Sequence, residues 1–203
     1  MNIQTTVLPR PAILANIRTL TPAELPLLRE HLLRLDKASR RDRFNGFVDD
    51  SFIERYSRQS ANDGTIILVY VEEGEIRGAA ELHQPDLTVG SLPEIAFSVE
   101  ASLRRRGVGS MLFEQLIAKA QSLNYQRLRI TTGSQNDAMR ALAGKFGAKL
   151  TFRHGESTGT IELEKLPVKT AASRKRGTWF DVQRAMFDYS KAFWTRALKP
   201  RES

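Results

Sequence analysis

The stretch from Glu94 to Ser110 reads EIAFSVEASLRRRGVGS. Its first six residues place apolar side chains at Ile95, Phe97 and Val99, and this alternation predicts a strand. Three arginines and two glycines follow, after which apolar residues recur at helical spacing and predict a helix over 108–123. The sequence therefore predicts a strand, a basic glycine turn and a helix in direct succession.

The start of this helix has the features of an anion site. A helix N-terminus leaves about four backbone N–H groups unpaired, and its dipole favours negative charge. Gly107 and Gly109 allow the backbone to approach an anion closely, and Arg104 to Arg106 add positive potential. No P-loop pattern is present, and Leu112 breaks the dinucleotide pattern G-x-G-x-x-G. The turn is predicted to bind a phosphate group; the plainer interpretation is a basic turn with two packing glycines.

Strands and helices alternate on both sides of this junction. A Thr-Pro-Ala-Glu capping pattern at Thr21 predicts a helix that runs to about Leu35, whereas Asp36 to Gly46 is charged and turn-prone. Further helices are expected at 50–59 and 136–146, and strands at 13–17, 65–71, 76–82, 94–99, 125–131, 148–153 and 160–164. This order predicts a mixed sheet with helices packed on it, and it excludes a doubly wound repeat.

Composition narrows the class of protein. The 203 residues are 41% hydrophobic and 27% charged, which is typical of one soluble globular domain. The absence of cysteine excludes disulfides, thiol nucleophiles and cysteine-bound metals. The longest apolar run, Ile66 to Val71, is too short to span a membrane, and the first residues do not resemble a signal peptide. We therefore expect a cytoplasmic protein.

The last part of the chain differs from the rest. Residues 171–203 carry eight Lys or Arg and three acidic residues, so they hold +5 of the net charge of +8. We expect a basic linker over 167–177 and an amphipathic aromatic helix over 178–199. Such a helix could pack on its own domain or on a second copy as a homodimer contact, and an anionic membrane surface is the alternative. Nucleic acid is a weaker candidate, because no basic and aromatic strand motif is present.

The spacing Arg104-x-x-Gly107-x-Gly109 resembles the acyl-CoA pyrophosphate motif of the GNAT superfamily of N-acetyltransferases. A second resemblance follows in Asn136-x-x-Met139-x-x-Leu142-x-x-x-Phe146-Gly147-Ala148, and the matching element order covers about residues 13–166. The resemblance implies an α/β (α+β) domain with a mixed, mostly antiparallel central sheet. Helices should lie on both faces, the sheet should splay between its fourth and fifth strands, and the C-terminal helix would be an addition.

The same resemblance implies that acetyl-CoA binds as the acyl donor. The backbone of Phe97, Ser98 and Val99 would pair with the pantetheine arm like an added strand. Asn136 would lie at that arm. Backbone amides would hold the pyrophosphate, contributed by Arg104, Arg105, Arg106, Gly107, Val108, Gly109 and Ser110.

Catalysis in this superfamily is direct attack of an amine on the thioester, and it requires a base. Glu94 resembles the glutamate that many members use for this purpose, and Glu81 and Glu100 are lesser candidates. Ala143 stands where many members have a tyrosine that protonates the leaving thiolate. Either another donor replaces it (Ser134, Tyr125 or a bound water), or protonation of the thiolate needs no dedicated acid. The alternative is a non-catalytic acyl-CoA-binding regulatory module.

The sequence does not identify the amine that accepts the acetyl group. The segments 36–59 and 85–92 are expected to determine which acceptor binds, and 36–59 contains both acidic and basic residues. The acidic residues Asp49, Asp50 and Glu54 favour a cationic amine. The basic residues Arg40, Arg41 and Arg43 favour an acceptor with an anionic group. The acceptor would be a small-molecule amine or a protein lysine. His83 and His154 lack acidic partners at ligand spacing, so no metal site is expected.

Overall fold

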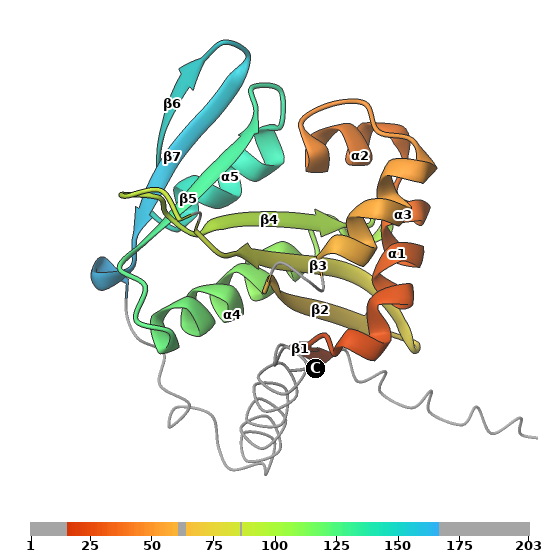
Figure 1. The fold of residues 1–203 in the computed structure, drawn as a ribbon. Coiled ribbons are helices and arrows are strands. Elements are labelled where there is room, and N and C mark those ends of the chain that lie inside the picture. The colour runs from red at the N-terminus through yellow and green to blue at the C-terminus, as the bar shows by residue number, and fades with distance from the viewer. Residues whose placement is uncertain (1–15, 61–63, 86, 167–203) are drawn as a thin grey trace, which may run out of the picture. The chain divides into compact units, whose positions relative to one another are not determined.

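The computed structural model describes residues 16–60, 64–85 and 87–166 (Figure 1). These residues form a seven-stranded sheet in the order β1-β2-β3-β4-β5-β7-β6, in which only the neighbours β4 and β5 are parallel. The strands are β1 (Asn16–Thr19), β2 (Ile66–Glu72), β3 (Glu75–His83), β4 (Glu94–Val99), β5 (Arg127–Gly133), β6 (Lys149–Arg153) and β7 (Glu156–Glu162). The helices are α1 (Leu25–Arg34), α2 (Lys37–Phe44), α3 (Asp50–Gln59), α4 (Val108–Ser122) and α5 (Asp137–Lys145), with short 3₁₀ turns at Pro22–Glu24, Ala101–Leu103 and Leu163–Lys165.

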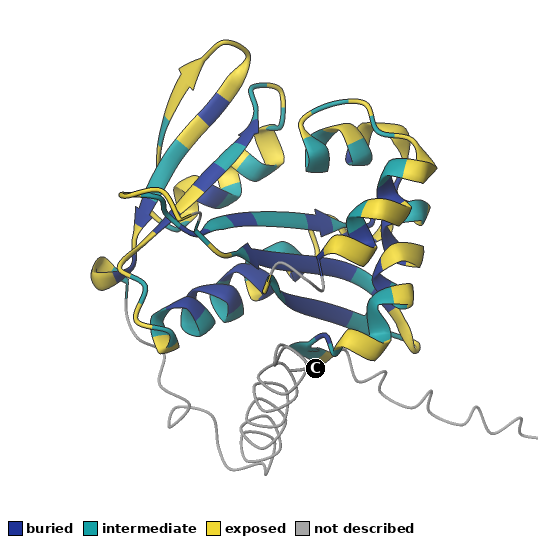
Figure 2. Cartoon of the chain, viewed as in Figure 1, coloured by how far each residue is buried: buried dark blue, intermediate teal, exposed yellow. Residues whose placement is uncertain are grey.

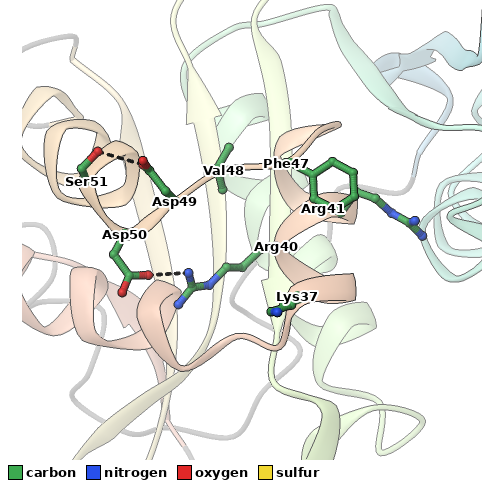
Figure 3. A pocket seen from close by; sticks show the side chains of 8 residues that line it. All are labelled: Lys37, Arg40, Arg41, Phe47, Val48, Asp49, Asp50 and Ser51. Atoms are coloured by element: carbon green, nitrogen blue, oxygen red, sulfur yellow. Dashed lines mark hydrogen bonds and ion pairs between the residues drawn. The ribbon is translucent and has the colours of Figure 1, made fainter.

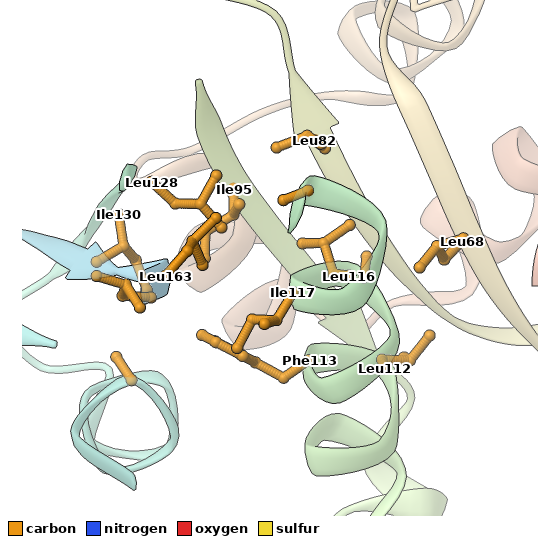
Figure 4. Packing of buried hydrophobic residues seen from close by; sticks show 14 of the residues in the cluster. Leu68, Leu82, Ile95, Leu112, Phe113, Leu116, Ile117, Leu128, Ile130 and Leu163 are labelled. Atoms are coloured by element: carbon orange, nitrogen blue, oxygen red, sulfur yellow. The ribbon is translucent and has the colours of Figure 1, made fainter. Parts of the chain in front are cut away.

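Helices cover both faces of the sheet, and each face has its own core (Figure 2). α1 and α3 pack on one face, where Leu28, Leu32 and Ile53 are completely buried. On the other face α4 lies against β2 to β5, and Phe113 and Leu116 reach the middle of that core (Figure 4). The predicted mixed sheet with helices on both faces is confirmed.

The prediction for residues 36–46 is wrong, because this segment contains α2. Asp36 caps the helix by accepting a hydrogen bond from the Ser39 N–H at 2.8 Å, and Asn45 ends it in the left-handed conformation. α2 turns Ser39, Arg43 and Phe44 inward, and Arg43 is paired with a buried carboxylate. An eight-residue helix that buries an arginine lacks the apolar periodicity by which helices are predicted.

Several strand boundaries also differ from the prediction, by one to four residues. β1 ends at Thr19, two residues later than expected, and the first three residues of the expected strand lie outside the described part of the chain. β7 begins at Glu156, four residues earlier than expected. Gly159 lies within β7, and a Cβ there would come within 2.2 Å of the Lys149 carbonyl oxygen. This close approach requires glycine, which interrupts the pattern that predicts a strand.

The expected linker over 167–177 and aromatic helix over 178–199 lie outside the described residues. Within the described part of the chain, no helix is long and apolar enough to cross a membrane.

Candidate functional site

The sheet opens between β4 and β5, as predicted. β4 pairs with β3 along its whole length, but it pairs with β5 only at Glu94, opposite Arg129, and at Ile95, opposite Ile130. Beyond Ile95 the two parallel strands have no further register pairs, and we call this opening between β4 and β5 the gap. The edge of β4 from Ala96 to Val99 that faces β5 is therefore available to another extended chain.

The turn after β4 forms a concave backbone at the N-terminus of α4, and we call its residues, 104–110, the cradle. Arg105 and Gly107 both adopt positive φ angles, +59° and +85°. The amides of Arg104 and Arg106 donate to carbonyls within the turn, at Ala101 and Leu103. The three amides that open α4, at 108–110, have no acceptor within the helix. Of the seven predicted phosphate-binding amides, those at the helix start are best suited to an anion.

The three arginine side chains of this turn make different contacts. Arg104 donates to the Ser39 hydroxyl in the first turn of α2, so it links the cradle to the opposite side of the sheet. Arg105 and Arg106 are exposed, and Arg106 lies 3.8 Å from Glu72. A further cation, Lys145 of α5, donates to Ser110 Oγ at 3.1 Å. Lys145 was not predicted, because only the fold brings it to the start of α4.

Three aromatic rings stack on one another between β4, α4 and the end of α5. Phe97 of β4 stacks on Phe113 of α4 with ring centroids 4.8 Å apart. Phe113 in turn stacks at 4.3 Å on Phe146, which ends α5. The stack connects β4 with α4 and α5 through apolar contacts within the core on this face of the sheet.

Asn136 and Ala143 belong to α5, which contacts β5 and β6. Asn136 is the N-cap of the helix, and its Oδ1 accepts the Met139 N–H at 3.0 Å. Ala143 is fully buried in the core. Of the replacements considered for a tyrosine at 143, the Tyr125 hydroxyl bonds to Gln84 near the far end of α4, about 22 Å from the cradle along the helix. Ser134 follows β5, and its amide donates to Gly155.

Glu94 begins β4 at the closed end of the gap. Its Oε2 accepts two hydrogen bonds from Arg129, at 2.6 and 3.1 Å, and both side chains are partly exposed. His83 lies directly opposite Glu94 in the β3–β4 register. The Glu94 carboxylate is accessible to solvent, but it forms an ion pair with Arg129. The sequence did not identify Arg129 as its partner.

Glu81 lies in register with Ala96, the first β4 residue beyond the β4–β5 pairs. Its carboxylate is completely buried; Arg43 donates to it at 2.7 Å and the Tyr56 hydroxyl also donates to it. Burial alone would raise the pKa of Glu81, but the Arg43 guanidinium outweighs this effect and lowers it. Burial likewise raises the pKa of Tyr56. Glu81 is therefore a fixed anion and a poor proton acceptor.

Glu100, the third candidate base, lies just after β4. Arg34 and Arg77 donate to it at 3.0 and 2.8 Å, and the buried imidazole of His31 lies 3.3 Å away. Burial would raise the pKa of Glu100, but these hydrogen bonds lower it to about 2. His31 was not predicted from the sequence. It lies between Leu28 and Leu32 in an apolar stripe, and a polar residue at such a buried position is the sequence feature that could have identified it.

A hollow of about 650 Å³ lies on the outer side of α2, between that helix and the start of α3 (Figure 3). Its rim carries Lys37, Arg40, Arg41, Phe47, Val48, Asp49, Asp50 and Ser51. Arg40 donates to Asp50 at 2.6 Å, so the two charges that could attract an acceptor partly neutralise each other. No group of three or more potential metal ligands occurs within the described ranges.

The comparisons with known proteins agree with this geometry. The model of the Acetyltransferase (GNAT) family matches residues 32–148. The GNAT domain of S. lividans PAT is 19% identical with a TM-score of 0.62, and the alignment covers 73% of this chain and 90% of that one. A GNAT-family acetyltransferase from Streptococcus pneumoniae is 19% identical with a TM-score of 0.57, over 73% and 98% of the two chains.

A third structure, yncA from Salmonella typhimurium with its cofactor acetyl-CoA, is 18% identical with a TM-score of 0.56, over 77% and 98% of the chains. The search of curated proteins found no match. The solved structures share the fold, and the family model spans more than half of the sequence, including the opened strand, the cradle and all of α5. The chain is a member of the GNAT acetyltransferase family.

Proposed function

We propose that this protein is an N-acetyltransferase that moves the acetyl group of acetyl-CoA to a primary amine. The observation that supports it most is the adjacency of two features. An unpaired strand edge at Ala96–Val99 leads directly into a helix N-terminus with a glycine-containing turn. A long ligand with amides at one end and a pyrophosphate at the other matches that succession.

The residues present fit acetyl-CoA. Gly107 holds a φ of +85° at the cradle, and the space around it is open. At Gly109 a Cβ would meet Leu142 at 3.5 Å, so the cradle passes close to α5. The amides of Val108, Gly109 and Ser110 would bind the pyrophosphate, and Lys145 adds positive charge beside them. Asn136 Nδ2 is the part of that side chain that its cap does not use.

Bound acetyl-CoA would supply an activated acetyl thioester. With the pyrophosphate at the cradle, the thioester end would lie toward Ala96 and Ile95. An amine acceptor with a pKa of about 10 arrives protonated, so a nearby group must remove a proton before attack. We assign this role to Glu94, which lies two residues before Ala96 and is open to solvent. Arg129 would turn from Glu94 when the ammonium group approaches.

The acceptor is a small-molecule amine or a protein lysine, and a panel of amines distinguishes them. The panel contains a polyamine, an aminoglycoside, free amino acids and a lysine peptide, and release of CoA is measured with each. Wild-type protein is expected to release CoA only when one of these amines is present. Binding of acetyl-CoA without amine-dependent release would favour the non-catalytic acyl-CoA-binding module instead.

Glu94→Gln tests the base. Acetyl-CoA affinity should stay within a few-fold of wild type, while turnover falls by about 10²–10⁴-fold, the range for a positioned proton acceptor. Glu30→Gln, which removes an exposed carboxylate of α1, is the matched control and should leave both unchanged. Near wild-type turnover of Glu94→Gln across the pH range would remove Glu94 from this role.

A further inference from the structure

A hydrogen-bonded chain of three side chains runs from β4 into the interior. Ser98 Oγ lies 2.9 Å from His31 Nε2, and His31 Nδ1 lies 3.3 Å from Glu100 Oε1. His31 is completely buried, and Ser98 and Glu100 are 6% and 8% exposed. The order of hydroxyl, imidazole and carboxylate is one in which the imidazole can take the hydroxyl proton while the carboxylate orients the ring and stabilises its charged form.

The directions of these hydrogen bonds follow from the charge states. Glu100 is ionised, because hydrogen bonds lower its pKa to about 2, and a carboxylate can only accept. Burial lowers the pKa of His31, so its ring is neutral and has one N–H. That N–H must be at Nδ1, where it donates to Glu100. Nε2 is then the ring acceptor, and the Ser98 hydroxyl donates to it.

The chain ends where the reaction would occur. Side chains alternate along a strand, so Glu94, Ala96 and Ser98 share one face of β4. Glu94 and Ser98 each lie two residues from Ala96, about 6–7 Å along the strand. Ala96 is the first residue beyond the β4–β5 pairs, at the thioester end of the proposed acetyl-CoA site. Ser98 is therefore the hydroxyl of β4 nearest to that position.

We propose that Ser98, His31 and Glu100 form a proton relay that serves both halves of acetyl transfer. This inference rests on the proposed function. Glu94 first removes a proton from the ammonium group. As the amine nitrogen bonds to the acetyl carbon, the nitrogen gives its next proton to Ser98 Oγ, and the Ser98 hydroxyl proton moves to His31 Nε2. When the bond from carbon to sulfur breaks, the same path returns a proton to the thiolate.

The protons of this reaction balance once Glu94 is counted. The ammonium group loses two N–H bonds: Glu94, which is partly exposed, takes the first proton and releases it to solvent, and the second proton passes through the relay and forms the S–H bond of CoA. The relay then returns to its starting state. The relay also supplies the proton for the leaving thiolate. Ala143 cannot supply it, because its side chain is buried and carries no hydroxyl. Ser98 is the catalytic residue of the relay, whereas His31 and Glu100 act through it.

The charges around His31 suit a transient imidazolium. Glu100 and Glu81 favour the charged ring, while burial and Arg34 oppose it. Arg77 donates to the other oxygen of Glu100 and holds that carboxylate in place. The neutral ring is therefore the resting state, and a carboxylate is already positioned against Nδ1 when Nε2 receives a proton.

Ser98→Ala tests the relay, and the assay uses the amine that gives the fastest CoA release in the panel. We expect kcat to fall by about 10²-fold or more, with the Kd for acetyl-CoA within about threefold of wild type. Ser98→Thr keeps a hydroxyl and should recover most of the lost rate. Ser57→Ala removes a buried serine hydroxyl that bonds only to the Ile53 carbonyl in α3, and it should leave kcat unchanged.

A second readout needs neither acceptor nor acetyl-CoA. The nitrogen-15 spectrum of His31, assigned by its loss in His31→Gln, should show a neutral ring protonated at Nδ1, and Ser98→Ala should shift the Nε2 signal. A ring protonated at Nε2 would overturn the relay. So would a Ser98→Ala enzyme with kcat within threefold of wild type, or one that no longer binds acetyl-CoA. If no amine releases CoA from wild-type protein, the proposed function fails, whatever the spectrum of His31 shows.

Discussion

Arg43 of α2 donates from Nη2 to Glu81 Oε1 of β3 across 2.7 Å, and both side chains are buried. This ion pair connects α2 to the sheet beside Ala96, the residue at which the pairing of β4 with β5 has ended. Asn45, at the C-terminus of the same helix, donates to Glu156 of β7. α2 therefore contacts the sheet on both sides of the gap.

Arg43→Met should strongly destabilise the protein, because it leaves the Glu81 carboxylate buried without its cation. We expect the free energy of unfolding, measured in urea, to fall by about 3–5 kcal/mol. Arg140→Met removes the exposed pair with Asp137 and should cost less than about 1 kcal/mol. A loss for Arg43→Met as small as that of the control would contradict the burial of this pair.

Glu100 should make stability depend on pH in the acid range. Its pKa falls from an ordinary 4.5 to about 2 on folding, so the unfolded chain binds the proton more readily. The contribution of Glu100 to stability is therefore complete above pH 4.5 and is lost as the pH falls toward 2. Urea unfolding at a series of acid pH values measures this slope. Glu100→Gln should flatten it, whereas a slope unchanged from wild type would exclude Glu100 as its source.

Much of the site could be predicted because it is local in sequence. β4 and α3 have the predicted boundaries, and α4 differs by one residue at its end, because their apolar residues follow a clear period. The cradle is one continuous segment, so its glycines and arginines were visible together. The opening of the sheet came from the family resemblance, and the register of β4 with β5 confirms it.

The parts that could not be predicted depend on contacts between distant segments. His31 and Ser98 are 67 residues apart, and nothing in either neighbourhood indicates that they bond. Arg129 meets Glu94 only because β4 and β5 are paired at that point. α2 was missed because its inward face carries Arg43, whose partner lies 38 residues away on β3.

Truncation after Thr170 tests the role proposed for the tail. Every residue of the cradle and gap lies between Glu94 and Ala148, so the truncated protein should still bind acetyl-CoA. If the aromatic residues of the tail pack on the domain or on a second copy, truncation should lower the melting temperature or the mass in solution. Light scattering and thermal melting measure both. Unchanged values with lost binding to anionic vesicles would favour a membrane contact instead.

Titration of acetyl-CoA into wild-type protein and into Gly109→Glu is the most direct test of the central claim, that the cradle and the opened strand hold acetyl-CoA. Wild-type protein should give saturable one-to-one binding. Gly109→Glu should stay folded, since a Cβ there makes ordinary contact with Leu142, but it should not bind, because its carboxylate occupies the pyrophosphate position. Ser122→Glu places the same charge at the other end of α4 and should bind normally. Equal affinity of Gly109→Glu and wild type would contradict the account.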